Sequence, residues 1–177
     1  ILGLILVITC GIFFWLTPEL MKLVVPGFDS EKMQMTITLT RIMFLSPILL
    51  GISGIASSVL QSFKNFLIYS LTPIMYNLGI IIGVIFFVPI WGINGLAYGV
   101  ILGALLHLAI QIPSLYHHGF RYQTLFLWRN KYVREIGKLM IPRTLGMAVS
   151  QINLLVITIL ASTLTAGSIA IFNLANN

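Results

Sequence analysis

The sequence predicts an all-α protein that crosses a membrane several times, and three observations lead to this prediction. No Asp, Glu, Lys or Arg occurs from Asn65 to Phe120, a run of 56 residues in which an ordinary soluble domain would carry about fourteen charges. Over the whole chain, 58% of the residues are hydrophobic, 8% are charged and the mean hydropathy is +1.02. Turn-forming residues divide this apolar sequence into segments of about 20 residues or more, long enough for a helix to span a bilayer.

The first two crossings precede the charge-free run. The first extends from about Ile1 to Val24 and ends at the turn Pro26-Gly27, which is followed by the acidic stretch 29–31. The second extends from about Gln34 to Gln61 and contains Pro47, which predicts a kink. Helices are the expected form because lipid offers no partners to free backbone groups.

The charge-free run contains two further crossings, and one more crossing and the start of a sixth follow a polar segment. In order, these parts are Leu67–Val88, Ile93–Tyr116, the polar segment His117–Lys138, Ile136–Ser162 and a last helix from Thr165 onward. Ile1 already lies within an apolar span and Asn177 lies within a predicted helix. We therefore expect this chain to be an internal piece of a longer protein.

The basic residues predict which side of the membrane each loop occupies. One side collects six cations and the other two; the six are Lys64, Arg121, Arg129, Lys131, Arg134 and Lys138, and the two are Lys22 and Lys32. The side with six is expected to be cytoplasmic. Because the cations occupy short segments between apolar spans, the net charge of +6 does not indicate nucleic-acid binding.

The basic segment around 118–135 has two interpretations. Aromatic residues, among them Trp128 and Tyr132, alternate there with cations. One interpretation is a cytoplasmic loop with an interfacial helix whose aromatic rings lie at headgroup depth. The other is a specific site for anionic lipid.

Small residues follow a four-residue spacing in the third and fourth crossings. The stripes consist of Gly79 and Gly83 in one, and of Gly95, Gly99 and Gly103 in the other. Such stripes let helix backbones approach closely in lipid, which predicts a tight bundle. His107 extends the second stripe, either as a neutral side chain hydrogen-bonded across a helix interface or as part of a proton relay.

Two arginines and a polar sector lie within spans. Arg41 is expected either to reach the outer headgroups or to face a cavity. In the fifth crossing, Arg143 shares a helical sector of about 120° with Thr144, Ser150, Gln151 and Thr158, and Asn153 lies to one side of it. A helix surrounded by lipid would not carry this sector, because unpaired polar groups in hydrocarbon are costly. We expect the sector to face protein or a water-filled cavity, where a cation would suit an anionic group such as phosphate.

The sequence contains no arrangement that indicates catalysis. The four acidic residues, Glu19, Asp29, Glu31 and Glu135, lie at or near the predicted membrane boundaries. No cluster has the spacing of metal ligands, and no phosphate loop or nucleophile elbow is present. Enzymatic chemistry is therefore not expected within this chain, and neither is a cofactor or a metal.

Several motifs, in order, resemble the MviN/MurJ lipid II flippase family, within the superfamily of multidrug and oligosaccharidyl-lipid exporters. They cover nearly the whole chain. The matching stretches are Pro26-Gly27-Phe28, Thr40-Arg41-Ile42 with Pro47, Pro73 with Asn77, Gly95-Leu96-Ala97, Gln111 with Pro113, Met140 with Pro142 and Gly146, Ser150-Gln151-Ile152-Asn153, Ala161-Ser162 and Gly167-Ser168.

The resemblance implies a fragment of a two-lobe transporter with about fourteen helices. Residues 1–117 would then be the latter part of the N-terminal lobe, 118–135 the cytoplasmic segment between lobes, and 136–177 the start of the C-terminal lobe. The implied activity is movement of the lipid-linked peptidoglycan precursor from the inner to the outer leaflet of the bacterial inner membrane by alternating access. The implied partners are the bilayer, the lipid-linked oligosaccharide pyrophosphate and cell-wall synthesis enzymes. Coupling to an ion or to the membrane potential is also implied.

At two positions the chain departs from the family pattern. Ile157 stands where many members carry an Asp in a run that coordinates an ion, and Asn177 stands where an Arg commonly faces the cavity. We hypothesise that Arg143 restores the missing cavity charge. Two alternative functions stay open: transport of another polyprenyl-linked oligosaccharide or of drugs, and a scaffold that binds cell-wall precursors without moving them.

Overall fold

The computed structural model describes residues 2–121, 131–164 and 167–175, which form helices and turns and no strand. Five helical segments within these residues are long and apolar enough to cross a membrane, and they are Gly3–Val24, Ser30–Ser62, Phe66–Trp91, Asn94–His117 and Lys131–Ser162. The predicted all-α class with five crossings is therefore confirmed. The segment 122–130, with Trp128, and the terminal Asn177 lie outside the described residues.

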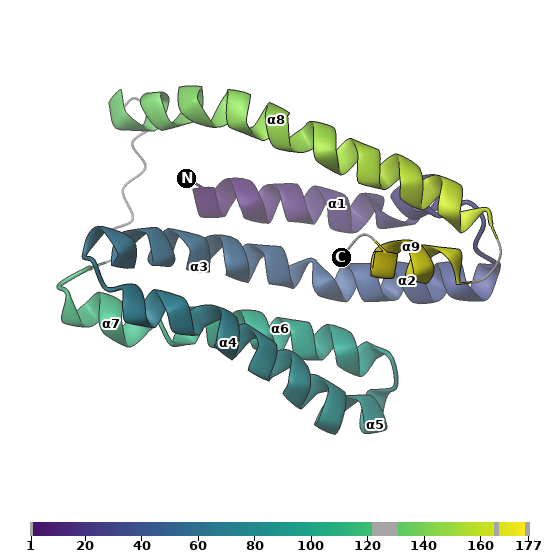
Figure 1. Ribbon diagram of the computed structural model, residues 1–177, viewed down its shortest axis with the longest axis horizontal. Helices are drawn as coiled ribbons and strands as arrows, with labels where there is room; N and C mark the ends of the chain where they lie inside the picture. Colours follow the sequence, from purple (N-terminus) through teal and green to yellow (C-terminus); the bar gives the residue numbers. More distant parts are fainter. Residues whose placement is uncertain (1, 122–130, 165–166, 176–177) are drawn as a thin grey trace. The chain divides into compact units, whose positions relative to one another are not determined.

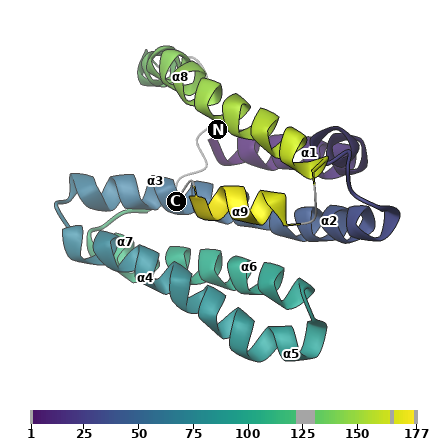
Figure 2. The ribbon, with the colours of Figure 1, turned by 45° about the vertical axis from the view of Figure 1, so that its right-hand side comes forward.

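The described residues divide into two compact units, which we treat separately. The first holds residues 2–15 and 38–121, and the second holds 16–37, 131–164 and 167–175. Both α1 (Leu2–Val24) and α2 (Ser30–Met43) run across this division. The first unit also contains α3 (Leu45–Ser62), α4 (Phe66–Ile82), η1 (Gly83–Phe87), α5 (Val88–Trp91), α6 (Asn94–Ala109) and α7 (Ile112–His117). Helices α3, α4 and α6 pack side by side in it (Figures 1 and 2).

The second crossing is interrupted between α2 and α3, at Phe44. The backbone N–H of Phe44 donates to the carbonyl of Thr40 (3.1 Å) and to that of Arg41 (3.4 Å), which tightens the turn. Pro47 causes the break because it has no N–H to offer the carbonyl of Met43, and its ring crowds that carbonyl. The kink predicted from Pro47 is thus confirmed, one turn ahead of the proline itself.

The start of α2 lies at Ser30 and not at the predicted Gln34. The backbone N–H of Lys32 donates to Oδ1 of Asp29 (2.9 Å), so that Asp29 caps the helix. This hydrogen bond, together with one from the Lys32 side chain, holds the pKa of Asp29 below its usual value. The acidic stretch therefore belongs to the first turn of the helix, where a negative charge is favourable, and not to the loop.

The third crossing continues from α4 through η1 into α5. The five residues of η1 form a π-helix that ends two positions before Pro89. Pro89 cannot donate to the carbonyl four residues earlier, and a π turn is one way a helix accommodates such a missing bond. The sequence predicts the crossing but not this local widening, because the hydrophobic pattern is the same for both kinds of turn.

The glycine stripes of α4 and α6 lie against each other. A Cβ on Gly79 would collide with the backbone of Gly103, and a Cβ on Gly83 would collide with that of Gly99. A Cβ on Gly95 would collide with the backbone of η1 at Phe87. The absence of side chains at these positions allows the two backbones to touch, as small residues do at helix interfaces in membranes.

Two helices of the first unit end side by side with the same capping motif. After α3, Asn65 N–H donates to the carbonyl of Leu60 and Lys64 N–H donates to that of Gln61. After α7, Phe120 and Gly119 donate in the same pattern to Leu115 and Tyr116. These are Schellman motifs, which place one residue in the left-handed region; it is Gly119 after α7 (φ 75°) and Lys64 after α3 (φ 57°).

A small core joins these two ends. Leu60 and Leu115 are buried together with Ala56, and Phe120 packs against them. The amide Nδ2 of Asn65 donates to Oγ of Ser114 (2.7 Å). The two ends therefore lie on one side of the unit, as required if Lys64 and Arg121 both face the cytoplasm.

The second unit contains α8 (Lys131–Ser162) and α9 (Ser168–Ala175), the predicted start of the sixth helix. The start of α8 lies before the predicted Ile136, because Lys, Arg and Glu are good helix formers and a charge boundary marks the membrane edge, not the helix end. The turn at Gly27 lies against the other end of α8: a Cβ there would fall 2.9 Å from Cα of Thr163. The turn that follows α1 and the end of α8 thus meet at one end of this unit.

Candidate functional site

The polar sector predicted in the fifth crossing lies on α8, a helix of 32 residues. Its members Arg143, Ser150 and Gln151 are exposed, as is Asn153 beside them. None of these four side chains has a hydrogen-bonding partner among the described residues of the chain. The helix is apolar enough to span a membrane, so these groups are not satisfied by their own helix.

Thr158, at the far end of the sector, behaves differently. Its Oγ1 donates to the carbonyl of Leu154 (2.8 Å), a bond within the same helix. From Arg143 to Thr158 the sector rises about 22 Å at 1.5 Å per residue, which is most of the hydrocarbon thickness of about 30 Å. A line of polar groups of this length suits a polar molecule that passes along the helix better than a single point of attachment.

Arg41 lies in the last turn of α2, beside aromatic residues. Its guanidinium carbon is 5.3 Å from the centre of the Phe14 ring, a cation–π contact worth about 0.5–2 kcal/mol. Its Nε is buried without a hydrogen-bond partner in the described part of the chain. Phe44 follows one turn later and stacks on Phe13 at 6.5 Å. The side chain is therefore packed within the first unit, and the aromatic contact was not predicted from the sequence.

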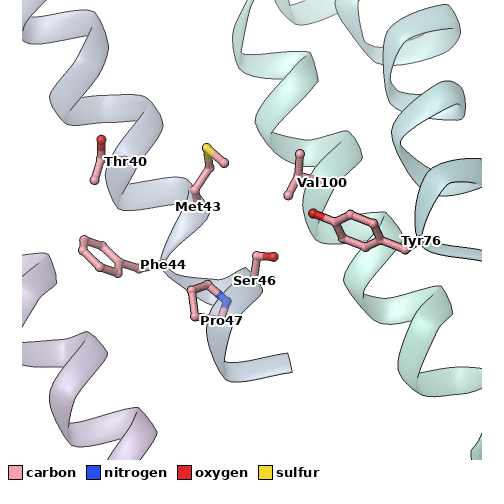
Figure 3. A pocket seen from close by; sticks show the side chains of 7 residues that line it. All are labelled: Thr40, Met43, Phe44, Ser46, Pro47, Tyr76 and Val100. Carbon is pink, nitrogen blue, oxygen red and sulfur yellow. The ribbon is translucent and has the colours of Figure 1, made fainter. Parts of the chain in front are cut away.

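A pocket of about 310 Å³ opens at the break between α2 and α3. It is mainly apolar, and Figure 3 shows Ser46 and Tyr76 pointing toward it from opposite sides. The residues that line it are Thr40, Met43, Phe44, Ser46 and Pro47 from the broken crossing, Tyr76 from α4 and Val100 from α6. The broken helix, and therefore Pro47, creates this space.

His107 belongs to a polar cluster that joins α3 to α6. Its Nδ1 lies 2.6 Å from Oγ of Ser53. The amide of Gln111 donates to Oγ of Ser53 and to the carbonyl of His107 (2.8 Å). The hydroxyl of Ser57 donates to Oε1 of Gln111 (2.9 Å). The structure thus places His107 in an interhelical hydrogen-bond network, and Ser53 and Gln111 are wholly buried in it.

Sequence reasoning did not identify the partners of His107. Each helix carries two polar residues four positions apart, Ser53 and Ser57 on α3, and His107 and Gln111 after them on the fourth crossing. Residues with this spacing lie on one face of a helix. Two such pairs in neighbouring apolar spans are a signal that could have indicated the cluster.

The described residues contain no group of three or more His, Cys, Asp or Glu side chains that could hold a metal ion. Within the predicted spans, the described part of the chain offers hydrogen-bonding side chains, the cations of Arg41 and Arg143, and the imidazole of His107. Such an arrangement can bind and orient a polar molecule.

Comparison with known proteins agrees with this description. A family model described as "Lipid II flippase MurJ" matches residues 1–177. A probable lipid II flippase MurJ of Buchnera aphidicola subsp. Acyrthosiphon pisum is 36% identical over 171 residues, which cover 94% of this chain and 33% of the relative. That of Haemophilus influenzae is also 36% identical, over 81% of this chain and 29% of its own length. The lipid II flippase MurJ of Burkholderia cenocepacia is 28% identical over 84% of this chain and 30% of its own.

This chain spans about a third of the length of these curated relatives. The match to the family model extends over all of its residues. The resemblance found from the ordered motifs is thereby confirmed: this multi-pass membrane chain belongs to the lipid II flippase MurJ family.

Proposed function

We propose that the protein to which this chain belongs moves lipid II, a muropeptide linked to undecaprenyl pyrophosphate, from the inner to the outer leaflet of a bacterial inner membrane by alternating access. Family membership supports the activity. At the level of residues, the single observation that carries the proposal is the polar sector on α8. Of its members, Thr158 alone has a hydrogen-bonding partner among the described residues.

The physical task explains why such a sector is needed. A head group of sugars, peptide and pyrophosphate must cross about 30 Å of hydrocarbon, where each unsatisfied polar group is costly. In this proposal Arg143 pairs with the pyrophosphate, because a guanidinium donates two parallel hydrogen bonds to phosphate oxygens. Ser150, Gln151 and Asn153 offer hydrogen bonds to the sugars and the peptide further along the helix. The undecaprenyl chain stays in the lipid.

The proposal extends to energy and partners. The proposal includes no cofactor or metal, since moving a lipid between leaflets breaks no covalent bond. Coupling to an ion or to the membrane potential supplies the free energy, and enzymes of cell-wall synthesis supply and consume the substrate. Ile157 is partly buried on α8 and has no oxygen ligand to offer, so an ion site of this protein does not use that position.

The test uses the full-length protein in two assays. One is rescue of growth in cells depleted of their own lipid II flippase, and the other is leaflet transfer of lipid II in reconstituted vesicles. Arg143→Ala should abolish both while the protein inserts normally. Lys138→Ala is the matched control, because it removes a cation from the same helix on roughly the opposite face and should retain activity. Wild-type transfer by Arg143→Ala would contradict the assigned role of the arginine.

Thiol labelling tests independently whether the polar sector on α8 is hydrated. Gln151→Cys should react with a water-soluble reagent in the intact protein, whereas Leu145→Cys, exposed on the other side of α8, should not. Protection of both positions would refute a hydrated sector. Binding of lipid II without leaflet transfer would favour the scaffold alternative, and rescue only in cells that lack a different lipid-linked sugar transporter would favour another substrate.

A further inference from the structure

The geometry around His107 fixes most of the donor and acceptor roles in its hydrogen-bond network. The carbonyl of His107 is only an acceptor, so the Gln111 group 2.8 Å away must be its amide nitrogen. The other amide hydrogen of Gln111 then points to Oγ of Ser53, and its Oε1 accepts from Ser57. The roles of Gln111 and Ser57 are thus set without reference to the histidine tautomer.

The hydroxyl proton of Ser53 can point to either of two acceptors. Its oxygen accepts from Gln111, and its proton has two acceptors within reach: Nδ1 of His107 at 2.6 Å and the backbone carbonyl of the same residue at 3.3 Å. When the proton points to Nδ1, the imidazole is neutral and carries its hydrogen on Nε2. When the proton points to the carbonyl, Oγ has a second lone pair free to accept a hydrogen from Nδ1.

We propose that Ser53, His107 and Gln111 form a proton-binding site inside the first unit. A proton taken from water binds Nδ1 and the imidazole gains one positive charge, while no covalent bond between heavy atoms changes. The Ser53 hydroxyl rotates from Nδ1 to the carbonyl, which has two lone pairs and keeps its bond from Gln111. The Ser53 hydroxyl, the Gln111 amide and Nδ1 of His107 remain hydrogen-bonded in both states, so the cluster accepts the proton without separating α3 from α6.

The elements around the imidazole carry no side chain that is ordinarily charged near neutral pH. The elements packed against α6 are α3, α4, η1, α5 and α7. They and α6 carry no Asp, Glu, Lys or Arg. Their other titratable side chains are Tyr69, Tyr76, Tyr98, Tyr116 and His117. Of these, Tyr76 contacts the imidazole ring edge-on, with the ring centres 6.4 Å apart. Tyr76 also lines the pocket at the helix break, so the pocket lies next to the site.

The experiment measures the proton directly and does not depend on transport. The full-length protein, labelled with ¹⁵N-histidine and placed in lipid nanodiscs, is titrated between about pH 8 and pH 5, where histidines change charge. His107→Gln identifies the signal by its loss. At the alkaline end we expect Nδ1 unprotonated and Nε2 protonated, and on acidification both nitrogens protonated, reversibly.

Two serine variants give the matched comparison. Ser53→Ala removes the acceptor for the new N–H, and because hydrogen bonds to a charged group are the stronger ones, the midpoint should fall by about half to one and a half pH units. Ser53→Thr keeps the hydroxyl and should titrate as the unmodified protein does. Ser58→Ala is the control, since Ser58 is exposed on the same helix and donates only to the carbonyl of Gly54 (2.9 Å).

Three results would overturn the proposal. One is a neutral imidazole protonated on Nδ1, and another is an imidazole that never gains a second proton over this range. Both are read from the unmodified protein, so they hold even where Ser53→Ala fails to fold. The third is an equal midpoint in Ser53→Ala and Ser58→Ala. Because the readout is titration, loss of lipid II transfer in other variants leaves this result untouched.

Discussion

The contact between α4 and α6 permits a sharp test of the packing, in which one substitution has opposite effects at two glycines. A Cβ on Gly103 would collide with the backbone carbonyl oxygen of Tyr76, and would lie 3.1 Å from its Cδ2 and 3.3 Å from its carbonyl carbon. Backbone atoms of a neighbouring helix cannot move aside singly, so the two helices must separate. A Cβ on Gly54, in the middle of α3, meets nothing within 4 Å.

The magnitude follows from two opposing effects. Overpacking costs about 1–3 kcal/mol, whereas replacing a glycine by alanine inside a helix gains about 0.5–1 kcal/mol. For Gly103→Ala the net result is a loss of up to about 2.5 kcal/mol in the free energy of unfolding. For Gly54→Ala only the gain remains, so the two variants should differ by the overpacking cost, about 1–3 kcal/mol.

The assay is equilibrium unfolding of the purified full-length protein in mixed detergent micelles, with the unmodified protein beside both variants. Gly103→Ala should unfold first and Gly54→Ala last. If Gly103→Ala is as stable as Gly54→Ala, the two backbones do not touch at this crossing and the close packing of α4 on α6 is wrong.

Three further predictions follow from single contacts. Asp29→Ala should destabilise the start of α2 near neutral pH, because it removes the helix cap. The stability that Asp29 contributes should be present above its unfolded pKa and should be lost as the pH falls through its lower folded pKa. Asp29→Asn keeps a capping side chain but has no carboxylate, so its unfolding should not show this loss of stability in acid. Lys64→Gly should stabilise the end of α3 by about 1 kcal/mol, because glycine adopts the left-handed conformation without the cost that a side chain incurs; equal or lower stability in the same detergent assay would contradict this. Gln111→Leu should cost about 1–3 kcal/mol by leaving the Ser57 hydroxyl without its buried acceptor, and the double variant with Ser57→Ala should recover part of that loss.

Most of the helical boundaries could be predicted from the sequence, for a physical reason. Hydrocarbon excludes charge, so the run from Asn65 to Phe120 and its turn near Gly92 mark two crossings without any knowledge of neighbours. The end of α8 at Ser162 was also predicted, although no charged residue follows it in the chain. The start of α2 was not, because it depends on the hydrogen bond between Asp29 and Lys32, which the apolar pattern does not report.

The sites were less predictable because they depend on register between helices. The helical sector around Arg143 lies on one helix, so its angular spacing is fixed by the sequence alone. The contact of Arg41 with Phe14 and the bonds from Ser53 to His107 join different helices, and their register is set by packing. The glycine stripes indicate that two helices approach closely, but which glycine meets which, such as Gly79 with Gly103, appears only in three dimensions.

The π turn of η1 has a consequence for how this chain tolerates changes in length. A π turn holds one residue more than an α turn needs, so removing a single residue from Gly83–Phe87 would convert it to an ordinary turn. Residues on both sides of the deletion would keep their faces, because the wide turn already accommodates the extra residue. A chain one residue shorter at this place would therefore present the same faces along the whole crossing, from α4 to Trp91.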